Sequence, residues 1–205
     1  MISTVEARWF FQGLCSDEVS DWFSSVTGVD VMPEIRTDEY LWLPGMTSLG
    51  VKTRGQNIEI KLRSREHGAV KLGPSAIGMI EQWRKWGFGV EDAPGEIDLA
   101  KYHVSEWIPI RKQRLLQRYE IKGGSEINPT DIESYPAAGC EVELTAVELR
   151  DQRWWTLAFE SYGEESTLVN SLKLTSATIL NLGSPPRLPE TRSFGYPEWL
   201  QRCAS

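Results

Sequence analysis

Basic side chains recur at every second position in two neighbouring stretches of the chain. They are Lys52, Arg54, Lys61, Arg63 and Arg65, with Glu59 as the one acid on the same parity. Two like charges about 6 Å apart repel by roughly 3 kcal/mol at an effective dielectric of about 20. If these cations face a confined space, they therefore need an anion, and the chemistry they suggest is anion binding.

Apolar and β-branched residues occupy the other parity of both stretches, Leu49–Arg54 and Asn57–Arg65. Alternation with a period of two predicts half-buried strands, and Gly55-Gln56 between them suits a hairpin. On an open sheet the charged face would meet water. Inside a closed barrel the same face would form a positively charged channel.

Charged residues also share a parity on other expected strands. These sets are Glu6 with Arg8, Lys112 with Arg114, and Glu141 with Glu143, while Glu160 stands alone in an apolar strand. Each set is either the solvated face of an antiparallel sheet or part of a common lumen. In a lumen, the cations would bind a polyanion and the carboxylates would hold Mg²⁺ or Mn²⁺, which prefer oxygen ligands.

The pattern of the whole chain predicts a mainly β (α+β) fold. About eight antiparallel strands would form a closed or nearly closed barrel or tunnel, with two or three outer helices. The expected strands are Val5–Gln12, Thr37–Pro44, Leu49–Arg54, Asn57–Arg65, Leu99–Lys122 divided near Gln113–Leu115, Glu141–Leu149 and Arg153–Ser161. The expected helices are Asp17–Ser25, Ser75–Trp86 and Glu164–Leu182, with a last turn at Glu198–Arg202, and Gly123–Gly139 is expected to be a loop. Residues 1–182 would form the barrel domain, and the proline-rich residues 183–205 a tail packed on it.

Composition narrows the functional classes. The net charge of −7 argues against a broad nucleic-acid-binding surface. Three well-separated cysteines argue against a disulfide framework, and the presence of just two histidines excludes a multi-histidine metal site. Without a signal peptide or an apolar run of about 18–20 residues, no membrane association is expected, and the expected location is cytoplasmic. The oligomeric state stays open.

In the order of its motifs the chain resembles the CYTH superfamily, the triphosphate tunnel enzymes. Thr4-Val5-Glu6-Ala7-Arg8 resembles the family signature E-x-E-x-K, and Lys52-Thr53-Arg54 resembles the paired basic motif R-x-R. Lys61 resembles the lysine of the next strand, and Lys112-Gln113-Arg114 resembles the later K-x-R motif. The late acidic strands resemble Glu141-Val142-Glu143 and Ala158-Phe159-Glu160. The resemblance runs from about Val5 to Glu160. It implies an eight-stranded antiparallel tunnel that binds or hydrolyses triphosphate compounds with Mg²⁺ or Mn²⁺.

The resemblance also implies roles for individual residues. A phosphate-rich small-molecule polyanion would contact Arg8, Lys52, Arg54, Lys61, Arg63, Lys112 and Arg114, the metal would be held by Glu6, Glu143 and Glu160, and Glu6 and Lys61 would be catalytic. The reaction would be attack of water on a terminal phosphate, with cations stabilising the charge. Thr4 and Ala158 replace family glutamates, so we expect anion binding to be better preserved than metal-dependent hydrolysis.

Two other interpretations remain open. A lipocalin-like barrel would turn its apolar parity inward and bind an apolar ligand among its Trp and Phe rings. A scaffold protein would keep the barrel but not the site, as the losses at Thr4 and Ala158 suggest. The parity that points inward at Ile58–Arg65 separates the tunnel from the lipocalin-like barrel.

Overall fold

The computed structural model describes residues 1–55, 57–89 and 107–203. Its strands are β1 (Ile2–Gln12), β2 (Glu34–Leu41), β3 (Leu49–Arg54), β4 (Asn57–Gly73), β5 (Ala76–Gly89), β6 (Trp107–Lys122), β7 (Glu126–Thr130), β8 (Gly139–Leu149) and β9 (Gln152–Tyr162). The helices are α1 (Asp17–Thr27), α2 (Leu168–Leu180) and α3 (Tyr196–Cys203), with short 3₁₀ turns η3 (Glu165–Thr167) and η4 (Glu190–Arg192). Within this part of the chain, no helix has the length and apolar character needed to cross a bilayer.

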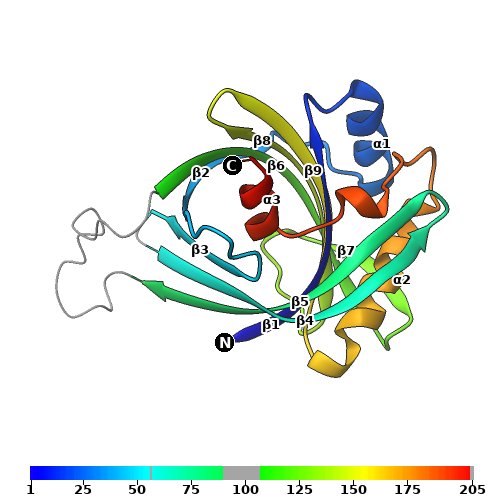
Figure 1. Ribbon diagram of the computed structural model, residues 1–205. Helices are drawn as coiled ribbons and strands as arrows, with labels where there is room; N and C mark the ends of the chain where they lie inside the picture. The colour runs from blue at the N-terminus through cyan, green and yellow to red at the C-terminus, as the bar shows by residue number, and fades with distance from the viewer. Residues whose placement is uncertain (56, 90–106, 204–205) are drawn as a thin grey trace.

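Eight of the strands close into an antiparallel barrel in the order β2-β3-β4-β5-β1-β9-β8-β6. The ring is completed by β2 and β6, which pair from Glu34 opposite Arg114 to Leu41 opposite Trp107. Strand β7 adds to β6 beyond this stretch. Figure 1 shows the strands arranged as a ring. The expected mainly β barrel with a few helices is therefore confirmed.

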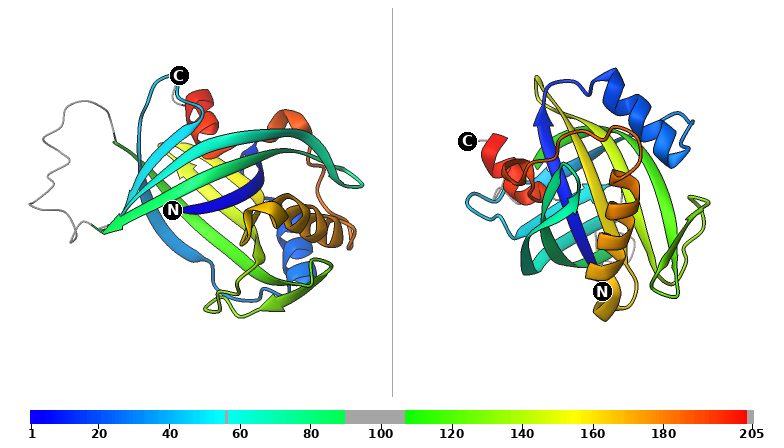
Figure 2. Two further views of the ribbon diagram at one scale, coloured as in Figure 1. Left: turned by 90° about the horizontal axis from the view of Figure 1, so that it is seen from below. Right: turned by 90° about the vertical axis from the view of Figure 1, so that its right-hand side faces the viewer.

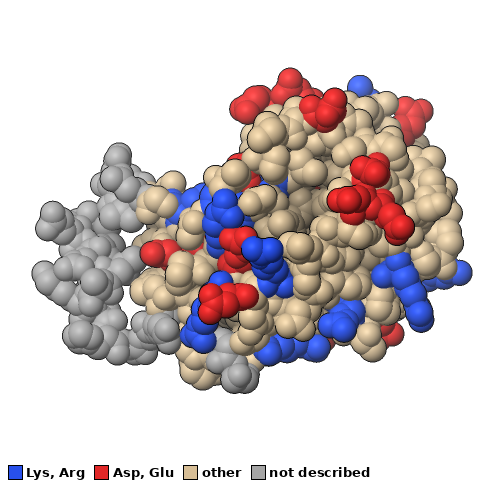
Figure 3. Space-filling view, turned by 90° about the horizontal axis from the view of Figure 1, so that it is seen from above, with Lys and Arg blue, Asp and Glu red and all other residues tan. Residues whose placement is uncertain are grey.

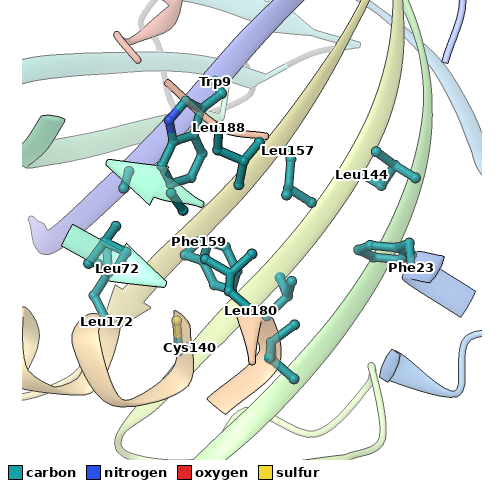
Figure 4. Packing of buried hydrophobic residues seen from close by; sticks show 14 of the residues in the cluster. Trp9, Phe23, Leu72, Cys140, Leu144, Leu157, Phe159, Leu172, Leu180 and Leu188 are labelled. Atoms are coloured by element: carbon teal, nitrogen blue, oxygen red, sulfur yellow. The ribbon is translucent and has the colours of Figure 1, made fainter. Parts of the chain in front are cut away.

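The main hydrophobic core lies outside the barrel wall, under α1 and α2. On β1 the odd-numbered Val5, Ala7 and Trp9 join this core, together with Phe159 of β9 and Leu172 of α2. Figure 4 shows these layers from close by, and the right-hand view of Figure 2 shows α2 alongside the strands. Burial of large apolar side chains on the outer face stabilises the wall. The other face of the same strands is left for the lumen.

Helix α3, which includes the last turn expected at Glu198–Arg202, crosses one end of the lumen. The Tyr196 ring lies 5.1 Å from Phe10 on β1 and 5.6 Å from Tyr40 on β2, between ring centroids. These strands are four positions apart in an eight-stranded ring, so they lie on opposite walls. Trp199 stacks on Phe10 at 5.2 Å. The aromatic residues of α3 therefore bridge the barrel. In Figure 1 the helix, in red, overlaps the ring of strands, and the right-hand view of Figure 2 shows it at one end of them.

The helix expected at Ser75–Trp86 is wrong, because Ala76–Gly89 is strand β5. Its apolar residues recur every three positions, which resembles a helical pattern. In the strand, Ile80 belongs to the outer core while Trp83 lines the lumen. A strand buried on both faces loses the period of two that identifies it in a sequence.

Two further expectations about the second half of the barrel are also wrong. The described part of Leu99–Lys122 is one continuous strand, β6, with no division near Gln113–Leu115. The loop expected at Gly123–Gly139 contains the short strand β7, in which Pro129 is tolerated because β7 lies outside the closed ring. Residues 99–106, and Gln56 of the predicted hairpin turn, lie outside the described residues.

The expected tail over residues 183–205 makes backbone contacts with the barrel. Leu188 forms a parallel bridge with Ala76, and Ser193 forms an antiparallel bridge with Trp9. The Ser193 hydroxyl also accepts a hydrogen bond from the Met79 amide at 2.8 Å. These contacts lead the chain back across the barrel surface to α3.

Candidate functional site

A charged cavity of about 170 Å³ lies in the barrel lumen. It is lined by nine of the ten residues named from the sequence: Glu6, Arg8, Lys52, Arg54, Lys61, Lys112, Arg114, Glu143 and Glu160. On β4, Glu59 and Lys61 reach the cavity, whereas the alternate residues Ile58 and Ile60 are not part of its lining. The charged parity of β4 therefore points inward.

Arg63 is the one expected anion contact that the structure places away from the cavity lining. Its guanidinium contacts Glu81 on β5 and lies 2.8 Å from Glu66. Both contacts are carboxylates of the protein, so Arg63 has no direct role at the cavity and instead fixes β4 against β5.

Other residues of the cavity were not assigned to the site from the sequence. They are Arg36, Tyr40, Gly50, Glu59, Trp83, Lys85, Glu141, Tyr196 and Pro197. Lys85 was not assigned to the lumen because a helix, and not a strand, was expected at Ser75–Trp86. Arg36, Asp38 and Tyr40 alternate along β2, and this period of two was the signal that could have identified them.

Arg8 of β1 connects two of the carboxylates. Its Nε donates to Glu6 at 2.7 Å, and its Nη1 donates to Glu143 at 2.7 Å and to the Thr156 hydroxyl at 2.8 Å. Burial acts to raise the pKa of Glu143, but Arg8 and Arg114 outweigh it and the pKa is well below its ordinary value. Both carboxylates are therefore ionised and held in place by cations.

Four glutamates lie in one row across adjacent strands, which we call the acidic row. Glu81 of β5 is in register with Glu6 of β1, Glu6 with Glu160 of β9, and Glu160 with Glu141 of β8. Directly opposed side chains have Cβ atoms about 4.5–5.5 Å apart, and like charges there repel.

Each carboxylate of the acidic row has a basic partner on another strand, either the adjacent strand (Glu81, Glu141) or the next but one (Glu6, Glu160). Glu81 contacts Arg63, Glu6 contacts Lys61, Glu160 lies 2.5 Å from Lys85, and Glu141 lies 2.7 Å from Arg118. Burial raises the pKa of Glu81 to about 7 despite Arg63. The paired cations therefore oppose the repulsion along the row, while burial keeps Glu81 the most easily protonated of the carboxylates whose pKa is shifted.

A second charged centre surrounds Asp38 of β2, which is fully buried. Its carboxylate lies 2.9 Å from Lys112, 2.9 Å from Arg54, 3.5 Å from Arg36 and 3.7 Å from Lys52. Burial acts to raise the pKa of Asp38, but Lys112 and Lys52 outweigh it, and the pKa lies well below its ordinary value. One carboxylate thus gathers four cations from β2, β3 and β6 on one side of the lumen.

Lys112 is the most perturbed of these cations. Its Nζ donates to Asp38 at 2.9 Å and to the Tyr40 hydroxyl at 2.8 Å, and lies 4.1 Å from the Tyr196 ring centroid. Burial and the neighbouring charge of Lys52 lower the pKa of Lys112 to about 7. An added anion would restore its charge.

The Tyr196 hydroxyl of α3 is buried and has no hydrogen-bond partner among the described residues. Tyr196 is part of the cavity lining, and its ring lies 5.0 Å from the Arg8 guanidinium. A buried hydroxyl without a partner is costly. This hydroxyl is therefore a donor available to a ligand.

The three residues expected to hold a metal do not fit that role as the structure arranges them. Glu6 is bound by Arg8 and Lys61, Glu143 by Arg8, and Glu160 by Lys85. Among the residues that the structure describes, no group of three or more His, Cys, Asp or Glu side chains is arranged to hold a metal ion. Hard divalent cations require free carboxylate oxygens, whereas both oxygens of Glu6 and of Glu143, and one oxygen of Glu160, already contact cations of the protein.

Comparison with known proteins adds little to this geometry. No family model matches the chain, and no curated protein matches it. Among solved structures it resembles a conserved hypothetical protein, Pfu-838710-001, from Pyrococcus furiosus, at 11% identity and a TM-score of 0.43. The alignment covers 95% of this chain and 98% of that one. This likeness is too distant to carry an argument about function.

Proposed function

We propose that the barrel binds a phosphate-rich, triphosphate-like small molecule in its charged lumen. The observation that carries the proposal is the inward direction of the charged parity on β4, where Glu59 and Lys61 reach the cavity. A barrel wall that needed only stability would turn these residues to water and its apolar residues inward.

The charge of the lining supports a polyanion as the ligand. Eight basic side chains line the cavity, against five carboxylates: Arg8, Arg36, Lys52, Arg54, Lys61, Lys85, Lys112 and Arg114 against Glu6, Glu59, Glu141, Glu143 and Glu160. The whole protein nevertheless has a net charge of −7. Positive charge is therefore concentrated in the lumen, and Figure 3 shows basic and acidic side chains interleaved on the face seen from above.

The arrangement of the cations suits a ligand with several anionic groups. The eight basic residues come from six of the eight barrel strands, so they surround the cavity. Phosphate oxygens accept charge-assisted hydrogen bonds from guanidinium and ammonium groups, and these are stronger than neutral ones. A compact chain of phosphates can contact cations on opposite walls at the same time.

The motif resemblance to the CYTH superfamily agrees with this proposal, since it implies triphosphate binding in an eight-stranded tunnel. In that reading Lys52, Arg54, Lys61, Lys112 and Arg114 are anion contacts. Hydrolysis would require attack of water on a terminal phosphate, with the cations stabilising the developing charge. Phosphate release measured alongside binding distinguishes a hydrolase from a receptor.

The lipocalin-like alternative requires the apolar side of β4 to face the lumen, but the charged side of β4 faces it. Aromatic residues do enter the lumen at Trp83 and Tyr196, but they lie over cations there: the Lys61 ammonium is 4.9 Å from the Trp83 ring. A scaffold role makes a different prediction, namely indifference to phosphate compounds.

The test is calorimetric titration of the protein with tripolyphosphate, with phosphate release followed in the same samples. We expect saturable binding that weakens as NaCl is raised, because salt screens charge interactions. Lys61→Ala should weaken binding at least tenfold, and Lys71→Ala, an exposed change on the same strand, should leave it unchanged. No binding by the wild-type protein, or unchanged affinity in Lys61→Ala, would overturn the proposal.

A further inference from the structure

Two lysines lie where the motif resemblance would place a divalent metal. Glu6 and Glu160 face each other across β1 and β9. The Lys61 ammonium contacts Glu6 and lies 3.7 Å from Glu160, and the Lys85 ammonium lies 2.5 Å from Glu160. The opposed carboxylates are thus bridged by one ammonium and capped by a second.

These contacts are strong because the groups are largely removed from water. Glu6 is 2% exposed, and the side chain of Glu160 is 16% exposed. Burial acts to lower the pKa of Lys85, but Glu160 and Glu59 outweigh it, so this pKa is raised and the lysine stays charged. Removing one partner of a buried ion pair leaves an uncompensated charge. A metal that displaced either ammonium would incur this cost.

The charge of the cavity also opposes a metal ion. Eight basic residues line the cavity against five carboxylates, or six with the buried Asp38 that contacts four of them, so a dication adds to a positive excess. Glu143 offers no help, because its Oε1 accepts from Arg8 at 2.7 Å and from Thr145 at 2.9 Å. Thr4 and Ala158 supply no carboxylate where the family pattern has one.

We propose that Lys61 and Lys85 act as built-in counter-cations in place of a divalent metal, so that the lumen binds its polyanion without Mg²⁺ or Mn²⁺. The inference rests on the proposed polyanion binding. It makes Glu160 an anchor for the two lysines rather than a metal ligand. It also makes the carboxylate a competitor of the phosphates for the same ammonium groups.

The direction in which Glu160→Gln changes the affinity for tripolyphosphate distinguishes the two roles of Glu160. If it anchors lysines, Glu160→Gln frees positive charge, and tripolyphosphate should bind about three- to tenfold more tightly in buffer containing EDTA. The same gain is expected in Mg²⁺. If Glu160 instead holds a metal through which the ligand binds, the same change should weaken binding in Mg²⁺. Glu165→Gln, an exposed change outside the lumen, is the control.

Direct metal titration gives a second readout that does not depend on the polyanion. The wild-type protein should show no Mn²⁺ binding below millimolar concentrations by electron paramagnetic resonance. Lys61→Met with Lys85→Met should expose the carboxylate pair and gain Mn²⁺ affinity by at least tenfold, whereas Lys71→Met should not. Micromolar Mn²⁺ binding by the wild-type protein would overturn the inference.

The outcomes also separate this inference from the proposed function. Tripolyphosphate binding in EDTA, with no gain from Mg²⁺ after correction for the Mg²⁺–ligand complex, supports both. Binding only when Mg²⁺ is present keeps the proposed function and overturns the inference. Absence of binding in both buffers overturns the proposed function, and with it the inference. If the double lysine variant does not fold, the Glu160→Gln titration still decides.

Discussion

Glu6 on β1 and Glu160 on β9 lie directly opposite each other in the antiparallel register, and the Lys61 ammonium contacts both carboxylates. The apolar core of this protein lies on the other side of the same strands. The barrel thus buries charge in its interior and hydrophobic residues beneath its outer helices. Four measurements follow from this arrangement.

Lys61 stabilises the fold as well as the site. Lys61→Met leaves Glu6 buried with Arg8 as its remaining cation, and removal of one partner of a buried pair costs about 3–5 kcal/mol. Because Arg8 remains, we expect a loss near 3 kcal/mol in the free energy of unfolding, measured by urea denaturation. Lys71→Met should change it by less than about 0.5 kcal/mol. Equal losses in the two variants would contradict the burial argument.

Ligand binding should take up a proton at Lys112. With its pKa at about 7, the lysine is mostly neutral at pH 8 in the free protein, and a bound polyanion raises that pKa. Affinity should therefore fall as pH rises from 6 to 9. Titrations at pH 8 in HEPES and in Tris should show an uptake of up to about one proton per ligand. Lys112→Arg should abolish the uptake, since arginine stays charged.

Glu81 should make the protein less stable as pH rises. Its folded pKa of about 7 lies above the ordinary value of 4.5, so the folded state binds more protons between these values. Stability from this group is complete below about pH 4.5 and is lost as pH rises through 7. Urea denaturation should show Glu81→Gln gaining stability over the wild type between pH 5 and 7.5, by up to roughly 3 kcal/mol. Glu66→Gln, which alters the exposed partner of the same Arg63, should show no such gain.

Tyr196→Phe should separate stability from binding. The hydroxyl it removes is buried without a partner among the described residues, and such a group costs about 1–3 kcal/mol. The variant should therefore be as stable as the wild type or more so in thermal denaturation. Tripolyphosphate affinity should fall about fivefold by calorimetry, because the ligand loses a donor. A variant that is less stable and binds equally well would contradict this role for the hydroxyl.

The sequence predicted the barrel where strands have one charged and one apolar face. Alternation in Asn57–Arg65 identified both the strand and its lumen side, because one parity belongs to each environment. It could not identify β5, since apolar residues such as Ile80 and Trp83 lie on opposite faces of that strand. Lys85 was missed for the same reason.

The contribution of α3 to the site depends on tertiary packing alone. Tyr196 and Pro197 follow a proline-rich segment with no strand pattern. Ring contacts with Phe10 and Tyr40, together with backbone contacts of the preceding tail, bring them to the lumen. Arg63 shows that strand parity alone does not place a side chain in the site. It shares the parity of Lys61, yet Glu81 on the next strand draws it away from the cavity. Parity gives the face of a strand but not the partner of a side chain.

The acidic row constrains how this sequence can diverge. Glu141 of β8 is paired with Arg118 on the adjacent β6, and Glu160 of β9 with Lys85 of β5, across β1. Loss of either member of such a pair leaves the other member's charge without its partner. Single exchanges at these positions should be rare among descendants, and paired exchanges that keep the local charge should be common. In related sequences these strands would then show correlated changes between residues far apart along the chain. Such correlations would identify the lumen-facing residues even where the individual sequence motifs are no longer recognisable.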